Sequence, residues 1–124
     1  MSLTALAAAV LMGQSAFSLV VERPASQAHD VAYAELASGR TQQAITKLEA
    51  DGGARSDDPA TLINLGAAYA RTGMSGKALS AFRAAVSTPV RYDLELADGT
   101  WVDSRFAARR ALSGLLAANR MASR

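Results

Sequence analysis

The sequence predicts an all-α fold of paired helices, with a small C-terminal β-hairpin and a final capping helix. The chain aligns with itself when it is shifted by 34 residues, which is the length of two helices of three to four turns with their turns. Half of the 124 residues are apolar, and alanine dominates over aromatic residues. This composition favours closely packed helices, and at this length we expect a single domain.

Residues 1–18 are uncharged and mostly apolar, and we interpret them as a cleaved signal peptide. Leu3–Met12 has the length of a signal-peptide hydrophobic region, and Ala16 and Ser18 suit a cut after Ser18. A basic residue before this region is missing, so an uncleaved membrane anchor and a helix packed on the domain stay open as alternatives. We expect residues 19–25 to be a linker and the protein to be periplasmic or secreted, or else membrane-anchored.

The internal repeat predicts two helical pairs over residues 26–92. In the first unit, Gly39 ends one helix and Thr41 starts the next. Val31–Leu48 aligns with Leu65–Phe82 without a gap, and the matched pairs are Val31–Leu65, Ala32–Gly66, Ala34–Ala68, Gly39–Gly73, Ala44–Ala78, Ile45–Leu79 and Leu48–Phe82.

The second unit carries clear helix boundaries. Asp58 is a good N-cap, and Pro59 at the first helical position loses no hydrogen bond. Gly73 can end this helix in the left-handed conformation. Ser75 can cap the next helix, and Pro89 blocks its continuation.

Gly66 lies inside the first helix of this unit, where a glycine costs about 1 kcal/mol relative to alanine. We expect packing to offset that cost, with Gly66 and Ala78 as small residues where two helices approach closely. Residues 62–71 and 77–87 should then lie side by side and antiparallel.

The second unit resembles a tetratricopeptide repeat. It departs from the family pattern in having leucine where tryptophan is frequent, and its proline comes one residue early. The first unit resembles a degenerate repeat. The resemblance implies a right-handed helical solenoid with a concave groove and a protein-binding role; the residues that carry it are Leu62, Leu65, Gly66, Tyr69, Ala78, Phe82 and Ala85, with Gly39, Ala44 and Leu48 in the first unit.

In this family, ligand contacts come mainly from the first helix of each repeat. The resemblance therefore implies a small, mostly apolar groove with Tyr33, Asn64 and Arg71 as polar anchors. We do not expect the carboxylate-clamp mode, because histidine and tyrosine stand where it needs lysine and asparagine. The partner-binding residues expected here are His29, Tyr33, Ile63, Asn64, Ala67 and Arg71.

The last third of the chain departs from the repeat. Apolar and acidic residues alternate before Asp98–Gly99, which predicts a β-hairpin over residues 93–103. Asp103 or Ser104 can cap a final basic helix over residues 104–124. Because about three repeats are usual for a stable array, we expect Trp101 and Phe106 to pack onto the second unit and complete the core, with homo-oligomerisation as an alternative.

Composition argues for binding rather than catalysis. The chain has no cysteine, a single histidine and no glycine-rich loop after a predicted strand, so we expect no catalytic, metal or cofactor site and no small-molecule substrate. We expect a protein or peptide partner. The alternative is a membrane- or nucleic-acid-associated adaptor acting through residues 104–124, which carry five arginines and no acid.

For nucleic acid, the interleaved aromatic residues that stack on bases are missing from this helix. Contact with a membrane through residues 1–21 stays open. The balance of charge is uneven, because residues 104–124 carry +5 and the chain as a whole carries only +2, which leaves −3 on the remainder.

Overall fold

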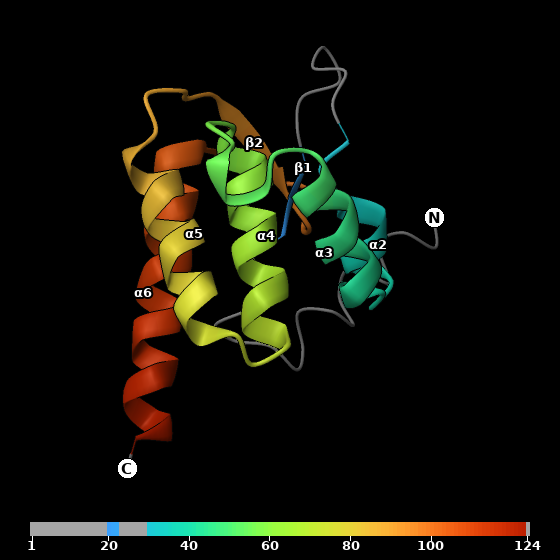
Figure 1. Cartoon of the computed structure of the whole chain (residues 1–124). Coiled ribbons are helices and arrows are strands. Elements are labelled where there is room, and N and C mark those ends of the chain that lie inside the picture. The colour runs from blue at the N-terminus through green and yellow to red at the C-terminus, as the bar shows by residue number, and fades with distance from the viewer. Residues whose placement is uncertain (1–19, 23–29, 124) are drawn as a thin grey trace.

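The computed structural model describes residues 20–22 and 30–123, and this part of the chain is mostly helical with a small antiparallel sheet (Figure 1). The leader expected at residues 1–18 and the candidate His29 lie outside the described residues. The elements in chain order are β1 (Val21–Glu22), α2 (Tyr33–Ala37), α3 (Thr41–Ala50), the 3-10 turn η1 (Gly53–Arg55), α4 (Pro59–Arg71), α5 (Ser75–Ser87), β2 (Asp93–Leu96), β3 (Trp101–Asp103) and α6 (Ser104–Ala122).

The pairs α2–α3 and α4–α5 are joined by turns of the same geometry, at equivalent positions of the sequence repeat. Gly39 and Gly73 have positive φ angles of 81° and 80°, a conformation that glycine adopts without strain. In both turns the residue after the glycine donates its backbone N–H across the turn at 2.8 Å, from Arg40 to the carbonyl of Glu35 and from Met74 to the carbonyl of Tyr69.

The start of α4 agrees with the prediction and the start of α5 does not. Asp58 caps α4 by accepting a hydrogen bond from the Thr61 backbone N–H at 3.0 Å. At α5, Ser75 already lies in the first turn, and Met74 at the cap position makes no side-chain hydrogen bond. The expected Ser75 cap is therefore wrong, because the tight turn after Gly73 starts the helix one residue earlier.

α2 is shorter than a full repeat helix. Ala32 precedes it with a φ of 62°, and its N–H donates to Asp30 Oδ1 at 2.8 Å. A right-handed helix does not pass through a left-handed residue. The first pair is therefore a five-residue helix packed on a ten-residue one.

α4 and α5 pack side by side and antiparallel, as the spacing of small residues predicts (Figure 1). The reason for Gly66 is the ring of Phe82, which is fully buried against it. A Cβ atom at Gly66 would lie 2.4 Å from Phe82 Cε1 and 2.5 Å from Cδ1. Ala78 is also fully buried. The cost of the glycine is thus offset by the packing of an aromatic ring on the helix backbone.

Tyr69 joins three helices on the other side of this pair. Its hydroxyl donates to Glu49 Oε2 of α3 at 2.5 Å, and the Lys77 ammonium of α5 lies 5.5 Å from its ring centroid. Burial, together with the hydrogen bond to Glu49, raises the pKa of Tyr69 to about 12. The hydroxyl therefore stays protonated and bonded across the neutral range.

The three strands form an antiparallel sheet in the order β1-β2-β3. β2 and β3 are the expected hairpin, with Leu94 opposite Val102. β1 adds a strand that the sequence did not predict, with Val21 opposite Leu96. Residues 19–25 were expected to be a linker, and this is wrong for Val20–Glu22, because two adjacent valines bury their side chains in the core.

α6 packs against α5 and α4, and small residues make the contact. Ser104, Ala107, Ala108, Ala111 and Leu115 are its buried positions. Asp103 caps the helix by accepting from the Phe106 N–H at 3.2 Å. The described helices include none that is both long enough and apolar enough to span a bilayer.

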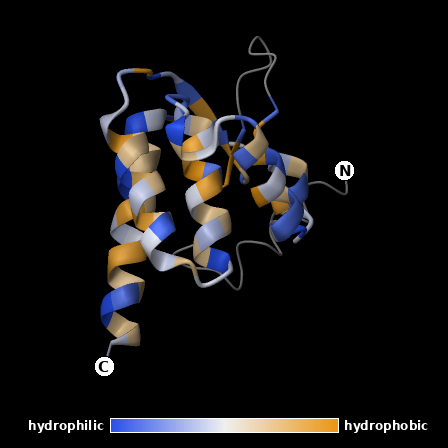
Figure 2. Ribbon diagram, viewed as in Figure 1, coloured by the Kyte–Doolittle hydropathy of each residue, from blue (hydrophilic) through white to orange (hydrophobic). Residues whose placement is uncertain are grey.

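The aromatic residues expected to complete the core do not do so. Trp101 is 54% exposed and Phe106 is 50% exposed. The buried positions of α6 are Ser104, Ala107, Ala108, Ala111 and Leu115, and the helical spacing puts Phe106 on the other side of the helix. Trp101 lies at an exposed position of β3. Figure 2 shows that hydrophobic and hydrophilic residues alternate along each helix, as expected for helices with one buried and one exposed side.

We predict that Gly66→Ala destabilises the protein by about 1–3 kcal/mol, because an added methyl group collides with a buried ring. Alanine is the better helix former by about 1 kcal/mol, so steric overlap must outweigh propensity. Urea unfolding measures the difference. Gly76→Ala on α5 is the matched control, because its Cβ meets nothing within 4 Å; it should be neutral or stabilising. Equal gains at both sites would contradict this account.

Candidate functional site

The centre of the candidate groove is the side chain of Asn64, which is fully buried on α4. Its Nδ2 donates to the carbonyl oxygens of Val21 at 2.8 Å and Val31 at 2.9 Å. Its Oδ1 accepts the Val21 backbone N–H at 2.8 Å. A carboxamide has the same donor and acceptor as a peptide group, so Asn64 pairs with Val21 as a neighbouring strand would.

The groove that the sequence predicted as open is filled in this structure. Ile63, Asn64 and Ala67 were expected to contact a partner, yet none of them is more than 1% exposed. Ile63 belongs to the same buried cluster as Val21 and Leu94 of the sheet. The sequence interpretation is wrong on exposure because the chain's own N-terminal strand and hairpin cover this face of α4.

Tyr33 and Arg71 lie at the partly buried margin of the same region. Arg71 Nη1 donates to the carbonyl oxygen of Leu36 at 3.1 Å, and burial lowers the pKa of its guanidinium. The pKa of the Tyr33 hydroxyl is raised, first by burial and then by the charges of Glu22 and Glu95. Tyr33 packs against the core cluster that contains Leu36, and Arg71 holds the end of α2 to α4.

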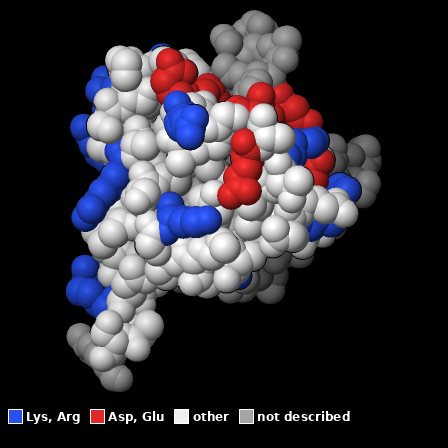
Figure 3. Space-filling model, in the orientation of Figure 1, with Lys and Arg blue, Asp and Glu red and all other residues white. Residues whose placement is uncertain are grey.

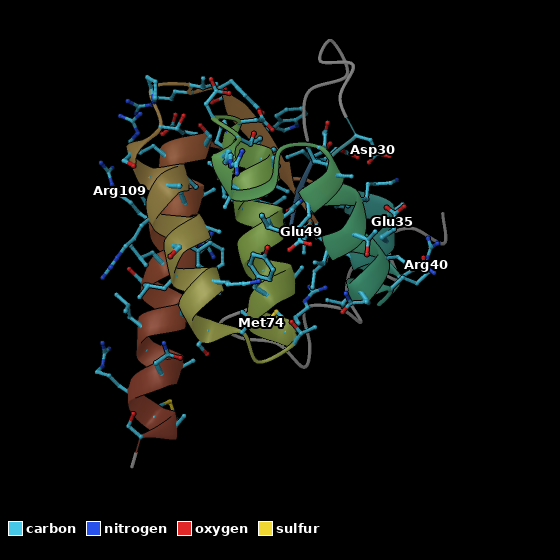
Figure 4. All side chains as sticks on the ribbon, in the orientation of Figure 1. Asp30, Glu35, Arg40, Glu49, Met74 and Arg109 are labelled. Carbon is cyan, nitrogen blue, oxygen red and sulfur yellow. The ribbon has the colours of Figure 1, made fainter. Side chains whose placement is uncertain are left out.

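An ion-pair cluster fastens α2 to α3 beside this region (Figure 4). Lys47 Nζ lies 2.7 Å from Asp30 Oδ2 and 2.7 Å from Glu35 Oε2. The hydrogen bond from Lys47 holds the pKa of Glu35 below its ordinary value, and the two carboxylates raise the pKa of Lys47. In the described part of the chain, no group of three or more His, Cys, Asp or Glu side chains is placed to hold a metal ion.

A second candidate surface is the exposed side of α6, which we call the outer face. Its three large apolar members are Phe106, Leu116 and Met121, which are 50%, 37% and 74% exposed. The sequence placed Phe106 in the core, although its spacing to the exposed Arg109 and Arg110 puts it on their side of the helix. The outer face consists of Phe106, Arg109, Arg110, Ser113, Leu116, Arg120 and Met121.

Comparison with protein-family models, with curated proteins and with solved structures gives no match to this chain. By its fold, the chain belongs to the class of mainly helical proteins, with two helical hairpins, a last helix and a small antiparallel sheet. The resemblance to tetratricopeptide repeats stays a prediction from the residues.

We predict that Asn64→Leu lowers the free energy of unfolding by at least about 2 kcal/mol, because each buried backbone group left without a partner costs roughly 1–3 kcal/mol. Three such groups lose their partner here, two on Val21 and one on Val31. Urea unfolding is the measurement. Asn119→Leu is the matched control on a partly exposed site, with an expected change within about 0.5 kcal/mol; an equal loss at both sites would contradict the role assigned to Asn64.

We predict that the stabilisation from Glu35 disappears in acid. Its pKa is lowered in the folded protein from the ordinary 4.5, so its contribution is present above that value and is lost as the pH falls through the folded pKa. Urea unfolding should show wild type more stable than Glu35→Gln at neutral pH, with the difference shrinking below pH 4.5.

Lys47→Gln provides the control for this prediction. In that background, Glu35→Gln should no longer change the pH dependence, because the main cause of the lowered pKa is gone. A difference that grows on acidification would contradict the sign.

Proposed function

We propose that this protein is a protein-interaction module whose two helical hairpins form a short, right-handed, tetratricopeptide-like solenoid. Its binding site lies over α4 and beside β2, and its ligand is an extended segment of a partner. The observation that carries the proposal is the bidentate grip of Asn64 on the backbone of Val21. In this structure the chain's own β1 takes the place of the ligand.

The grip supports peptide binding because it is indifferent to side chains. All three hydrogen bonds of Asn64 go to backbone groups, two of them to the N–H and C=O of Val21 and one to the C=O of Val31. β2 pairs with the same segment as a neighbouring strand. Recognition by an added strand uses this combination, in which main-chain hydrogen bonds supply affinity and pockets for alternate side chains supply specificity. Here the side chain of Val21 is buried in one apolar cluster with Ile63 and Leu94, which favours an apolar residue at this position of a ligand.

The size of β1 supports exchange with a partner. β1 pairs with β2 through only two residue pairs, Val21 with Leu96 and Glu22 with Glu95. A partner segment that makes the same backbone bonds and a longer strand pairing would compete with it. Export to the periplasm or out of the cell is part of the same proposal and rests on the residue pattern of positions 1–18.

A labelled peptide with the sequence of residues 17–24, FSLVVERP, tests the proposal by fluorescence anisotropy. The wild-type chain should bind it weakly because β1 competes. Val21→Pro removes the backbone N–H that donates to Asn64, which weakens the binding of β1 to its own site. Because β1 then competes less, affinity for the peptide should increase by at least about tenfold, or about 1.4 kcal/mol.

Two controls make the test specific for the backbone grip. A peptide N-methylated at its second valine cannot donate to Asn64 and should lose the gain. Adding Asn64→Leu to Val21→Pro should abolish binding. If circular dichroism shows Val21→Pro folded and it binds neither peptide, or binds both equally, the proposed function is wrong.

A further inference from the structure

We propose that the outer face of α6 binds an acidic amphipathic helix of another protein. This inference is independent of the site over α4, because it rests on different residues on another side of the molecule. Two properties of the outer face carry it: three large apolar side chains are exposed on it, and its charged residues are all arginines.

The apolar side chains of the outer face are spread over the length of a helix of about four turns. Leu116 and Met121 follow Phe106 by 10 and 15 residues, which is about 15 and 22 Å along an α-helix. No residue of α6 beyond Leu115 is buried, and in Figure 1 the C-terminal turns of α6 extend past the first turn of α5. Around the helix, Leu116 and Met121 lie on the two flanks of the outer face, with Phe106 between them. A partner helix of about four turns that lies along the middle of the outer face would run past all three side chains.

The charges of the outer face favour an acidic partner. Arg109, Arg110 and Arg120 are exposed, and residues 104–124 contain no acid. Within the described part of the chain, none of these three arginines forms an ion pair with a carboxylate. Arg110 lies 5.9 Å from the Phe106 ring, so cation and apolar anchor occupy one patch. Figure 3 shows blue side chains along the edge formed by α6 and red ones gathered elsewhere.

The same features argue against other occupants. A second copy of α6 would bring arginines against arginines, and like charges in contact are repulsive. A helix that lies on a membrane inserts a continuous apolar face and keeps its cations on the other side. The continuous apolar face of α6 is already buried on α5 and α4, so it is not available to a membrane. A nucleic acid would leave the exposed side chains of Leu116 and Met121 without apolar partners.

The test uses a labelled helical peptide of about 18 residues with leucine along one face and glutamate elsewhere, and a matched peptide with lysine in place of glutamate. Fluorescence anisotropy with the full chain should show binding of the glutamate peptide and at least about tenfold weaker binding of the lysine peptide. Leu116→Ser should weaken binding of the glutamate peptide.

Charge reversal provides the matched controls. Arg109→Glu with Arg120→Glu should reduce affinity for the glutamate peptide by at least about tenfold and should create affinity for the lysine peptide. Arg40→Glu, on the opposite side of the molecule in Figure 4, should leave affinity within about twofold. Circular dichroism checks that each variant is folded.

Three results would overturn the proposal. The first is equal binding of the two peptides by the wild-type chain. The second is an equal loss of binding in Arg40→Glu. The third is tighter binding to phosphatidylserine vesicles or to a short DNA duplex than to the glutamate peptide, which would assign the face to a membrane or a nucleic acid instead.

Discussion

The structure depends on the complete enclosure of α4. Every residue from Pro59 to Ala70 is buried, so the polar groups of this helix must find partners inside the protein. In the first turn, Asp58 accepts a hydrogen bond from the Thr61 backbone N–H, and it also accepts one from the Tyr92 hydroxyl. In the middle of the helix, the buried carboxamide of Asn64 is hydrogen-bonded to the backbone of Val21 and Val31. Enclosing one helix therefore requires the N-terminal strand and the hairpin as well as the neighbouring helices.

This enclosure explains how a chain with only two helical pairs forms a stable core. An array of repeats normally buries its faces by stacking further repeats. Here the sheet covers one face of α4, α3 covers another, and α5 with α6 covers the third. The groove that two open hairpins would present is consequently filled by the chain itself.

The parts of the fold that the sequence predicted are the local ones and those tied to the repeat. Gly39 and Gly73 end helices because left-handed turns suit glycine, and Asp98–Gly99 makes a hairpin because that pair suits a tight turn. The burial of Gly66 could also be inferred, because an unfavourable glycine inside a helix signals close packing. The identity of the packing group, the ring of Phe82, was not predicted.

What the sequence determined by itself was the helical repeat, its turns, the hairpin and the basic last helix, since each depends on neighbouring residues. What only the tertiary structure decided was exposure. Val20 and Val21 are too short a β-branched segment to distinguish a linker from a strand by pattern. Val21 lies in a strand because β2, which is far away in the sequence, pairs with it. Asn64 was expected to be exposed and is buried, whereas Phe106 was expected to be buried and is exposed. Burial could not be predicted because it depends on segments far away in the chain that come to lie against a residue.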